Sequence, residues 1–187
     1  MRRTEGRRAP LSAESYGIVS NVIVVDSHNS DEAIRAIQAH ECGVVINGGT
    51  PRILRTQLLS SFEAVVNCHP GILPEYRGCT CVEWAVFNDD PVGNTVHLMT
   101  PGIDEGPIVC SEAVALGVSD DYLATRVKVF RHGFDLLATA AVRIARGDVS
   151  ISALPAQEEG TYWAPIDDRK LLIVMDKLSR GVYRYQS

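Results

Sequence analysis

The sequence predicts an α/β protein in which helices cover a mostly parallel β-sheet. Short apolar runs alternate along the chain with amphipathic stretches of helical spacing. Two of the runs, 43–47 and 62–66, are mostly apolar, as strands covered on both faces are. No run approaches the roughly 20 apolar residues that a membrane-spanning helix needs. We therefore expect one soluble domain with no membrane partner.

Composition narrows the class of protein further. The 187 residues, 45% of them hydrophobic, suffice for one compact domain with a full core. The 23 acidic and 18 basic residues give a net charge of −5, which offers no broad positive field to polynucleotide phosphates. We predict no nucleic-acid partner. Four arginines lie within residues 1–8, and we predict a basic, disordered tail over residues 1–15.

The five cysteines are an odd number in a chain without a secretory apolar region. This pattern favours reduced thiols in the cytoplasm. Cys79 and Cys81 stand too close together, and too far from further ligands, for a zinc site. We predict no metal.

The first half of the chain reads as strand, helix and strand. Residues 21–25 form an apolar run, and residues 29–32 offer a helix cap that opens a helix to about His40. Residues 43–47 follow as a buried strand that ends in a glycine-rich turn. A unit of this kind is parallel and right-handed. Residues 62–66 predict the next buried strand.

The second half begins with a predicted helix over 80–88, followed by two β-rich segments at 94–99 and 107–116. Ser119 is expected to cap a long helix that ends at Gly147. A final helix is expected over 168–180. The residues expected to be buried in the long helix are Leu123, Val127, Phe130, Phe134 and Leu137. Those on the apolar face of the final helix are Leu171, Leu172, Met175 and Leu178.

Polar side chains stand where the strand at 62–66 ends. Positions two apart in a strand point to the same face, so Asn67 and His69 share a face, with α-carbons about 6.5 to 7 Å apart. Cys68 then points into the packing. An amide donor is thus paired with a group that holds a proton near neutral pH. The alternative is a polar strand end that only ties down a turn.

A second polar cluster lies between the two β-rich segments. Asp104 stands in a turn flanked by Gly102 and Gly106, where a carboxylate can be aimed at a pocket. Taken alone, Asp104 can equally be an ordinary turn residue.

Together these stretches resemble the folate-dependent formyltransferase family, which includes glycinamide ribonucleotide, methionyl-tRNA and sugar-nucleotide N-formyltransferases. The resemblance rests on NCHPGILP at 67–74 with YRG at 76–78, on TVH at 95–97 with GIDEGPI at 102–108, and on NGGTPRIL at 47–54. Three blocks in the correct order make it specific, and it covers roughly residues 17–147. It implies a Rossmann-like three-layer fold with a mostly parallel sheet.

The resemblance implies transfer of a formyl group from 10-formyltetrahydrofolate to a primary amine of a small molecule. Asn67, His69 and Asp104 match the catalytic trio of the family. Asn67 and a protonated His69 would stabilise the oxyanion, and Asp104 would raise the proton affinity of His69 and help to remove a proton from the amine. His97 matches a supporting position. The residues that match the pterin site are Thr50, Pro51, Arg52, Ile53, Leu54, Thr100, Gly102 and Ile103.

The chain departs from the family at its start. The family domain opens with a strand, a glycine-rich turn, a helix and a second strand, which residues 1–15 are too short and too polar to contain. The sequence thus predicts an N-terminally truncated fold, or else a natural protein that starts further upstream. The lost strand would leave residues 22–25 to pair elsewhere, for instance beside residues 44–46. The missing turn disfavours glycinamide ribonucleotide as substrate.

Only about 40 residues follow the long helix, which disfavours tRNA and leaves an amino sugar nucleotide as the expected acceptor. Two rival functions stay open: a hydrolase that releases formate from the same folate, and an inactive module that binds folate or another subunit. We expect residues 16–150 to form the catalytic domain and residues 151–187 an extension with one helix. This helix is expected to pack back on its own domain, although it also suits a dimer contact, and we predict a homodimer.

Overall fold

The structure is a computed structural model that describes residues 23–50 and 52–187. The chain divides into two compact units, residues 1–40 and 41–187, and each is described by itself. The predicted N-terminal tail lies outside the described residues. In the described part of the chain, no helix is both long and apolar enough to cross a membrane.

The described part of the first unit contains one helix, α1 (Asp31–Gln38). The Ser30 side chain caps it by accepting a hydrogen bond from the backbone N–H of Ala33 at 3.1 Å, so the predicted capped helix is confirmed. The strand predicted over 21–25 is wrong for its described part, because residues 23–25 form no strand. An apolar run becomes a strand only where a neighbour pairs with its backbone, and the local pattern does not determine that neighbour. The parallel unit expected from it is therefore not formed by the described residues.

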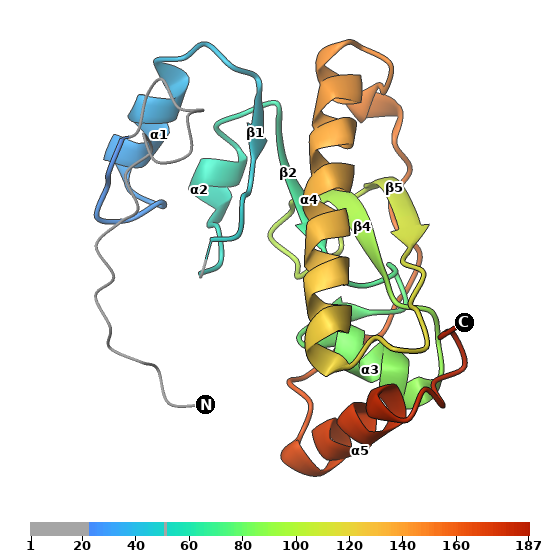
Figure 1. The fold of residues 1–187 in the computed structure, drawn as a ribbon. Coiled ribbons are helices and arrows are strands. Elements are labelled where there is room, and N and C mark those ends of the chain that lie inside the picture. Colours follow the sequence, from blue (N-terminus) through green and yellow to red (C-terminus); the bar gives the residue numbers. More distant parts are fainter. Residues whose placement is uncertain (1–22, 51) are drawn as a thin grey trace. The chain divides into compact units, whose positions relative to one another are not determined.

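The second unit is built on a four-stranded sheet in the order β1 (Val44–Ile46), β2 (Ala64–His69), β4 (Gly93–Leu98) and β5 (Ile108–Ala113) (Figure 1). All four strands were predicted, with bounds that shift by a few residues. The β1–β2 pair is parallel, whereas β2–β4 and β4–β5 are antiparallel. The sheet of the described strands is thus mixed, and one of its three strand pairs is parallel, the arrangement that was predicted for most of the sheet. A short helix, α2 (Thr56–Leu59), joins β1 to β2.

Helix α4 (Tyr122–Ala145) covers one face of this sheet (Figure 1). It begins two residues later than predicted, because Asp121 rather than Ser119 supplies the cap, accepting from the N–H of Ala124 at 2.8 Å. Its buried residues pack against fully buried Val66 and Val96 of the sheet. Burial of each valine contributes roughly 1.5–3 kcal/mol.

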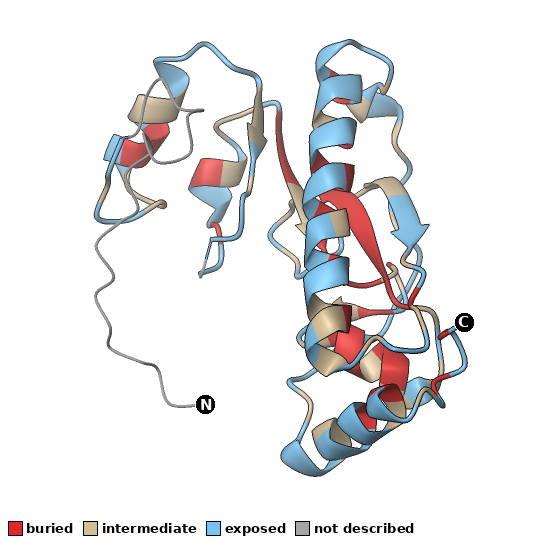
Figure 2. Ribbon diagram, in the orientation of Figure 1, coloured by how far each residue is buried: buried red, intermediate tan, exposed pale blue. Residues whose placement is uncertain are grey.

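The buried face of α4 differs from the predicted one. Leu137 is buried as expected, but four other predicted core residues are exposed: Leu123, Val127, Phe130 and Phe134. Figure 2 shows α4 with exposed, pale blue stretches along its length and buried, red stretches between them. The residues buried instead are Thr125, Val129, Gly133, Leu136, Ala140 and Ile144. The buried Asn94 of β4 donates to the backbone oxygen of Val129 at 2.9 Å. Gly133 permits this approach, since a Cβ there would lie 2.9 Å from the Asn94 oxygen. The helical periodicity of the sequence alone does not show which of these two faces of α4 is buried.

A second core joins α3 (Cys81–Asn88) to α5 (Asp168–Ser179) and to the buried Tyr183 near the C-terminus. The predicted packing of the last helix on its own domain is therefore confirmed, and residues 41–187 form one unit. Its buried face is centred on Val174 and Leu178, whereas Leu172 and Met175, predicted on the apolar face, are exposed. The predicted homodimer stays a prediction.

A small parallel sheet links this region to the middle of the chain. In it, β3 (Arg77–Gly78) pairs with β6 (Tyr162–Trp163). The loop that follows His69 is thereby held beside a segment more than 80 residues later.

Candidate active site

The register of the sheet brings the predicted site residues together. Residues Ala64, Val66 and Cys68 of β2 pack toward α4, so Asn67 and His69 point to the other face, as predicted from strand alternation. On β4, His97 lies directly opposite Asn67.

The carboxamide of Asn67 has a defined orientation. Asn47 Nδ2 donates to Asn67 Oδ1 at 3.1 Å. The Asn47 oxygen itself accepts from the backbone N–H groups of Gly49 and Thr50 at 3.2 and 3.0 Å, which leaves its nitrogen facing Asn67. Asn67 Nδ2 therefore points to His97 Nε2, 3.2 Å away. This nitrogen carries a second hydrogen that can be donated to a substrate oxygen.

The protonation of His97 follows from its neighbours. Its Nδ1 lies 3.0 Å from the backbone oxygen of Leu98, which can only accept, so Nδ1 carries the proton. Nε2 is then free to accept from Asn67. His97 is thus a neutral ring in this arrangement, with its second nitrogen 3.6 Å from Asp104 Oδ1.

His69 is buried between two acceptors. Its Nε2 donates to the backbone oxygen of Tyr76 at 2.6 Å, and its Nδ1 lies 3.4 Å from Asp104 Oδ2. Gly71 makes room for the first bond, because a Cβ there would lie 2.7 Å from His69 Nε2. A proton that enters this site therefore binds at Nδ1, where the carboxylate stabilises it.

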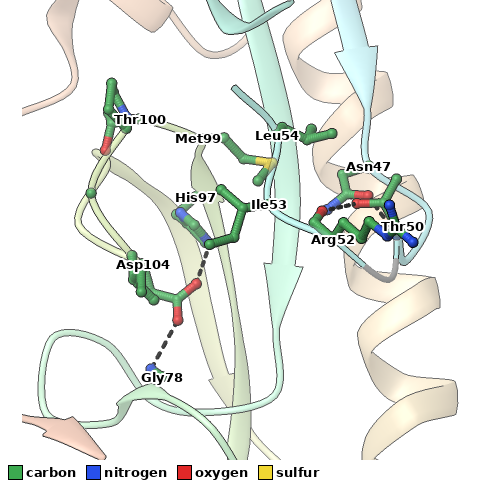
Figure 3. A pocket seen from close by; sticks show the side chains of 13 residues that line it. Asn47, Thr50, Arg52, Ile53, Leu54, Gly78, His97, Met99, Thr100 and Asp104 are labelled. Atoms are coloured by element: carbon green, nitrogen blue, oxygen red, sulfur yellow. Dashed lines mark hydrogen bonds and ion pairs between the residues drawn. The ribbon is translucent and has the colours of Figure 1, made fainter. Parts of the chain in front are cut away.

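The Asp104 carboxylate connects these groups (Figure 3). Its backbone adopts the left-handed conformation with φ of 55°, in the glycine-flanked turn that the sequence predicted. Oδ2 accepts from the backbone N–H of Gly78 at 2.9 Å. One carboxylate thus faces both His69 and His97.

Burial lowers the pKa of both His69 and His97 below the ordinary value of 6.5, because desolvation penalises the charged ring. The Asp104 carboxylate opposes this effect by raising the pKa of each ring. Both rings are therefore mainly neutral at pH 7, with a counter-charge beside them that can stabilise a proton taken up during a reaction.

The two lowered pKa values lead us to expect that the free energy of unfolding falls as the pH drops below about 6.5. The unfolded chain binds protons at both rings near that pH, whereas the folded protein binds them only at lower pH. Stability is then lost by up to about 1.4 kcal/mol per pH unit for each ring. Urea unfolding between about pH 7.5 and pH 5 measures this slope. A His97→Gln variant should show a smaller slope, and an unchanged slope would contradict the assignment.

A pocket of about 410 Å³ opens beside this cluster (Figure 3). His97 and Asp104 reach it together with Thr50, Arg52, Ile53, Leu54, Thr100, Gly102 and Ile103, so these seven predicted cofactor-binding residues line one cavity. Pro51, the eighth, lies outside the described residues. The exposed side chain of Ile53 and the buried Leu54 give one wall an apolar surface. Backbone groups and apolar side chains of this kind suit a flat heterocycle.

Asn67 and His69 are not among the residues that line this pocket. Asn67 instead lines a second cavity of about 80 Å³, which Phe130 and Phe134 of α4 border. Asn47 lines both cavities. Asn67 therefore borders the second cavity and contacts Asn47, while His69 lies behind Asp104.

Sequence reasoning missed two groups at this site. Asn47 belongs to the block that carries the family resemblance, yet nothing in its pattern showed that its side chain would orient Asn67. The hydrogen bond from the backbone N–H of Gly78 to Asp104 cannot be predicted from residue types. Both contacts depend on how loops distant in sequence meet.

The fold is shared with a class of known enzymes. The structure superposes on the formyltransferase PseJ from Anoxybacillus kamchatkensis with a TM-score of 0.62, at 20% sequence identity, over 78% of each chain. That protein was solved in complex with UDP-4,6-dideoxy-4-formamido-L-AltNAc and tetrahydrofolate. The predicted fold class is thereby confirmed.

Sequence comparison identifies the family. Residues 11–137 match the model described as formyl transferase. The phosphoribosylglycinamide formyltransferase of Mycobacterium tuberculosis is 35% identical over 147 residues, which cover 74% of this chain and 68% of the relative. The chain belongs to the formyl transferase family.

A further relative is the methionyl-tRNA formyltransferase of Trichodesmium erythraeum, which is 26% identical over 171 residues. The match covers 88% of this chain and 50% of the relative. The chain thus spans about half the length of this relative.

Proposed function

We propose that the protein transfers the formyl group of 10-formyltetrahydrofolate to a primary amine of a small molecule, and that this amine belongs to an amino sugar nucleotide. The observation that carries the proposal is the convergence of Asn67, His69, His97 and Asp104 beside the 410 Å³ pocket. Membership of the formyl transferase family supports the reaction.

The pterin of the folate occupies the large pocket in this proposal. Backbone groups of residues 52–54 and 100–104 would bind its polar edge, and Ile53 and Leu54 its ring. The formyl group then lies toward Asn67. The smaller cavity gives the amine a separate approach to Asn67, as a reaction between two substrates requires.

Attack of the amine on the formyl carbon forms a bond from nitrogen to carbon and places a negative charge on the formyl oxygen. The second hydrogen of Asn67 Nδ2 stabilises this oxyanion. Asp104, with His69 beside it, accepts the proton that the amine nitrogen must lose. Collapse of the intermediate expels N10 of the folate, which takes up a proton, and releases the formamide and tetrahydrofolate. No covalent intermediate with the enzyme is needed.

The amino sugar nucleotide is supported by the fold shared with PseJ, which was solved with a formamido sugar linked to UDP. The net charge of −5 also disfavours a polynucleotide acceptor. Glycinamide ribonucleotide and methionyl-tRNA, the acceptors that the names of the two relatives indicate, are the competing amines.

Turnover of 10-formyltetrahydrofolate by the purified protein tests the proposal. Tetrahydrofolate absorbance is followed with no amine, with a panel of amino sugar nucleotides, with glycinamide ribonucleotide and with methionyl-tRNA, for the native protein and for His69→Ala. Release that requires an amino sugar nucleotide and disappears in His69→Ala supports the proposal. Release without any amine indicates the hydrolase. Saturable folate binding without release indicates an inactive binding module.

A further inference from the structure

A glutamine in the segment after α4 contacts the turn that carries Asp104. Gln157 Nε2 donates to the backbone oxygens of Asp104 and Gly106, at 3.0 and 2.5 Å. Gln157 Oε1 accepts from Arg77 Nη2 at 3.0 Å. One carboxamide thus joins the turn that carries Asp104 to the loop that carries Arg77.

The turn needs an external partner, because its own backbone does not favour this shape. Asp104 is a residue with a side chain in the left-handed region, at φ of 55°, which is sparsely populated. Gly106 runs so close to β4 that a Cβ there would lie 1.8 Å from the backbone oxygen of Leu98. The two hydrogen bonds from Gln157 hold the backbone oxygens of these two residues, Asp104 and Gly106.

The same segment also holds the group that binds the carboxylate. Arg77 precedes Gly78, whose N–H donates to Asp104 Oδ2 at 2.9 Å. Both residues pair with Tyr162 and Trp163 of β6. Residues 157–163 therefore hold two parts of the site. One is the strand that contains Gly78, whose backbone N–H binds the carboxylate. The other is the turn that carries Asp104, whose backbone oxygens accept from Gln157.

The close fit of this segment supports a fixed position. A Cβ on Gly160 would lie 1.9 Å from the backbone oxygen of Pro74, and Trp163 Nε1 donates to the backbone oxygen of Glu75 at 2.9 Å. Arg77 Nη2 also donates to the backbone oxygen of Glu158 at 2.7 Å. Contacts of this density hold the segment firmly against the loop that carries Gly78.

We propose that Gln157 is a positioning residue that holds the Asp104 turn, and hence the Asp104 carboxylate, in the geometry required for formyl transfer. This inference rests on the proposed function, in which Asp104 takes part in proton transfer. Gln157 touches no reacting atom and acts only through Asp104. A small displacement of a catalytic group lowers kcat far more than it lowers substrate binding.

Two variants test this role. Gln157→Glu keeps an oxygen for Arg77 but replaces the donor to the turn by an acceptor, which repels both carbonyls. Gln157→Met keeps the length of the side chain and removes every hydrogen bond. Glu159→Ala, at an exposed neighbouring position, is the matched control. Each is measured by steady-state kinetics with the best amine and by amide hydrogen exchange of residues 100–107.

We expect kcat to fall about 10- to 100-fold in both variants, with KM for the folate changed by less than about threefold. Hydrogen exchange should rise in residues 100–107 and stay unchanged in β2. Unchanged exchange in the turn, or unchanged kcat despite faster exchange, overturns the proposal. If the native protein turns over no amine, the proposed function fails, and hydrogen exchange still decides whether Gln157 holds the turn.

Discussion

Replacement of Asn67 by alanine is expected to lower kcat for formyl transfer by about 10²- to 10³-fold, the usual loss when one oxyanion donor is removed. Asn67 Nδ2 is oriented from both sides, by Asn47 and by His97, so the donor is in place before the charge develops. No reorganisation is then needed during the reaction. Stopped-time assays of tetrahydrofolate release with saturating amine give kcat directly.

Val66→Ala is the matched control for this variant. Val66 lies on the same strand but is fully buried against the α4 side of the sheet. Its truncation should lower the free energy of unfolding by about 1–3 kcal/mol and leave kcat unchanged. If Val66→Ala reduced kcat as much as Asn67→Ala, loss of structure rather than loss of the donor would explain both results.

Replacement of Asp104 by asparagine is expected to lower kcat by about 10²- to 10⁴-fold, the range for loss of a group in proton transfer. The asparagine oxygen can still accept from the N–H of Gly78, so the turn is retained. The variant removes the carboxylate charge, which is the largest effect that opposes burial, so the pKa of His69 and of His97 should fall further.

The histidine signals report this change independently of activity. NMR titration of the ring carbons in the native protein and in Asp104→Asn measures each pKa. Lower values together with low kcat support the role of the carboxylate. Native kcat in Asp104→Asn would show that Asp104 is a structural turn residue, which is the alternative reading of its sequence.

The local part of the site could be predicted because strand alternation is a local property. The period of two placed Asn67 and His69 on one face and Cys68 in the packing, and the structure confirms this arrangement. The two glycines around Asp104 likewise predicted a turn, and the backbone of Asp104 shows it. The catalytic roles of these residues stay predictions that the two variants test.

The helices show where local patterns fail. The apolar residues of α4 form two stripes, and the predicted one, with Phe130 and Phe134, is exposed. The other stripe was selected by Asn94, which bonds to the helix backbone where Gly133 leaves room. Because this partner lies on another element, the apolar periodicity of α4 by itself does not show which stripe is buried.

The amino-acid sequence by itself determined the α/β class, the four strands of the described sheet, the shared face of Asn67 and His69, and the turn at Asp104. These features follow from side-chain periodicity and turn chemistry, which act over a few residues. The tertiary structure alone decided the orientation of the Asn67 amide, its contact with His97 and the contact of Gln157 with the Asp104 turn. Each depends on a hydrogen bond between residues 20 to 53 positions apart, and only the packing of the folded chain brings such partners within 3.2 Å.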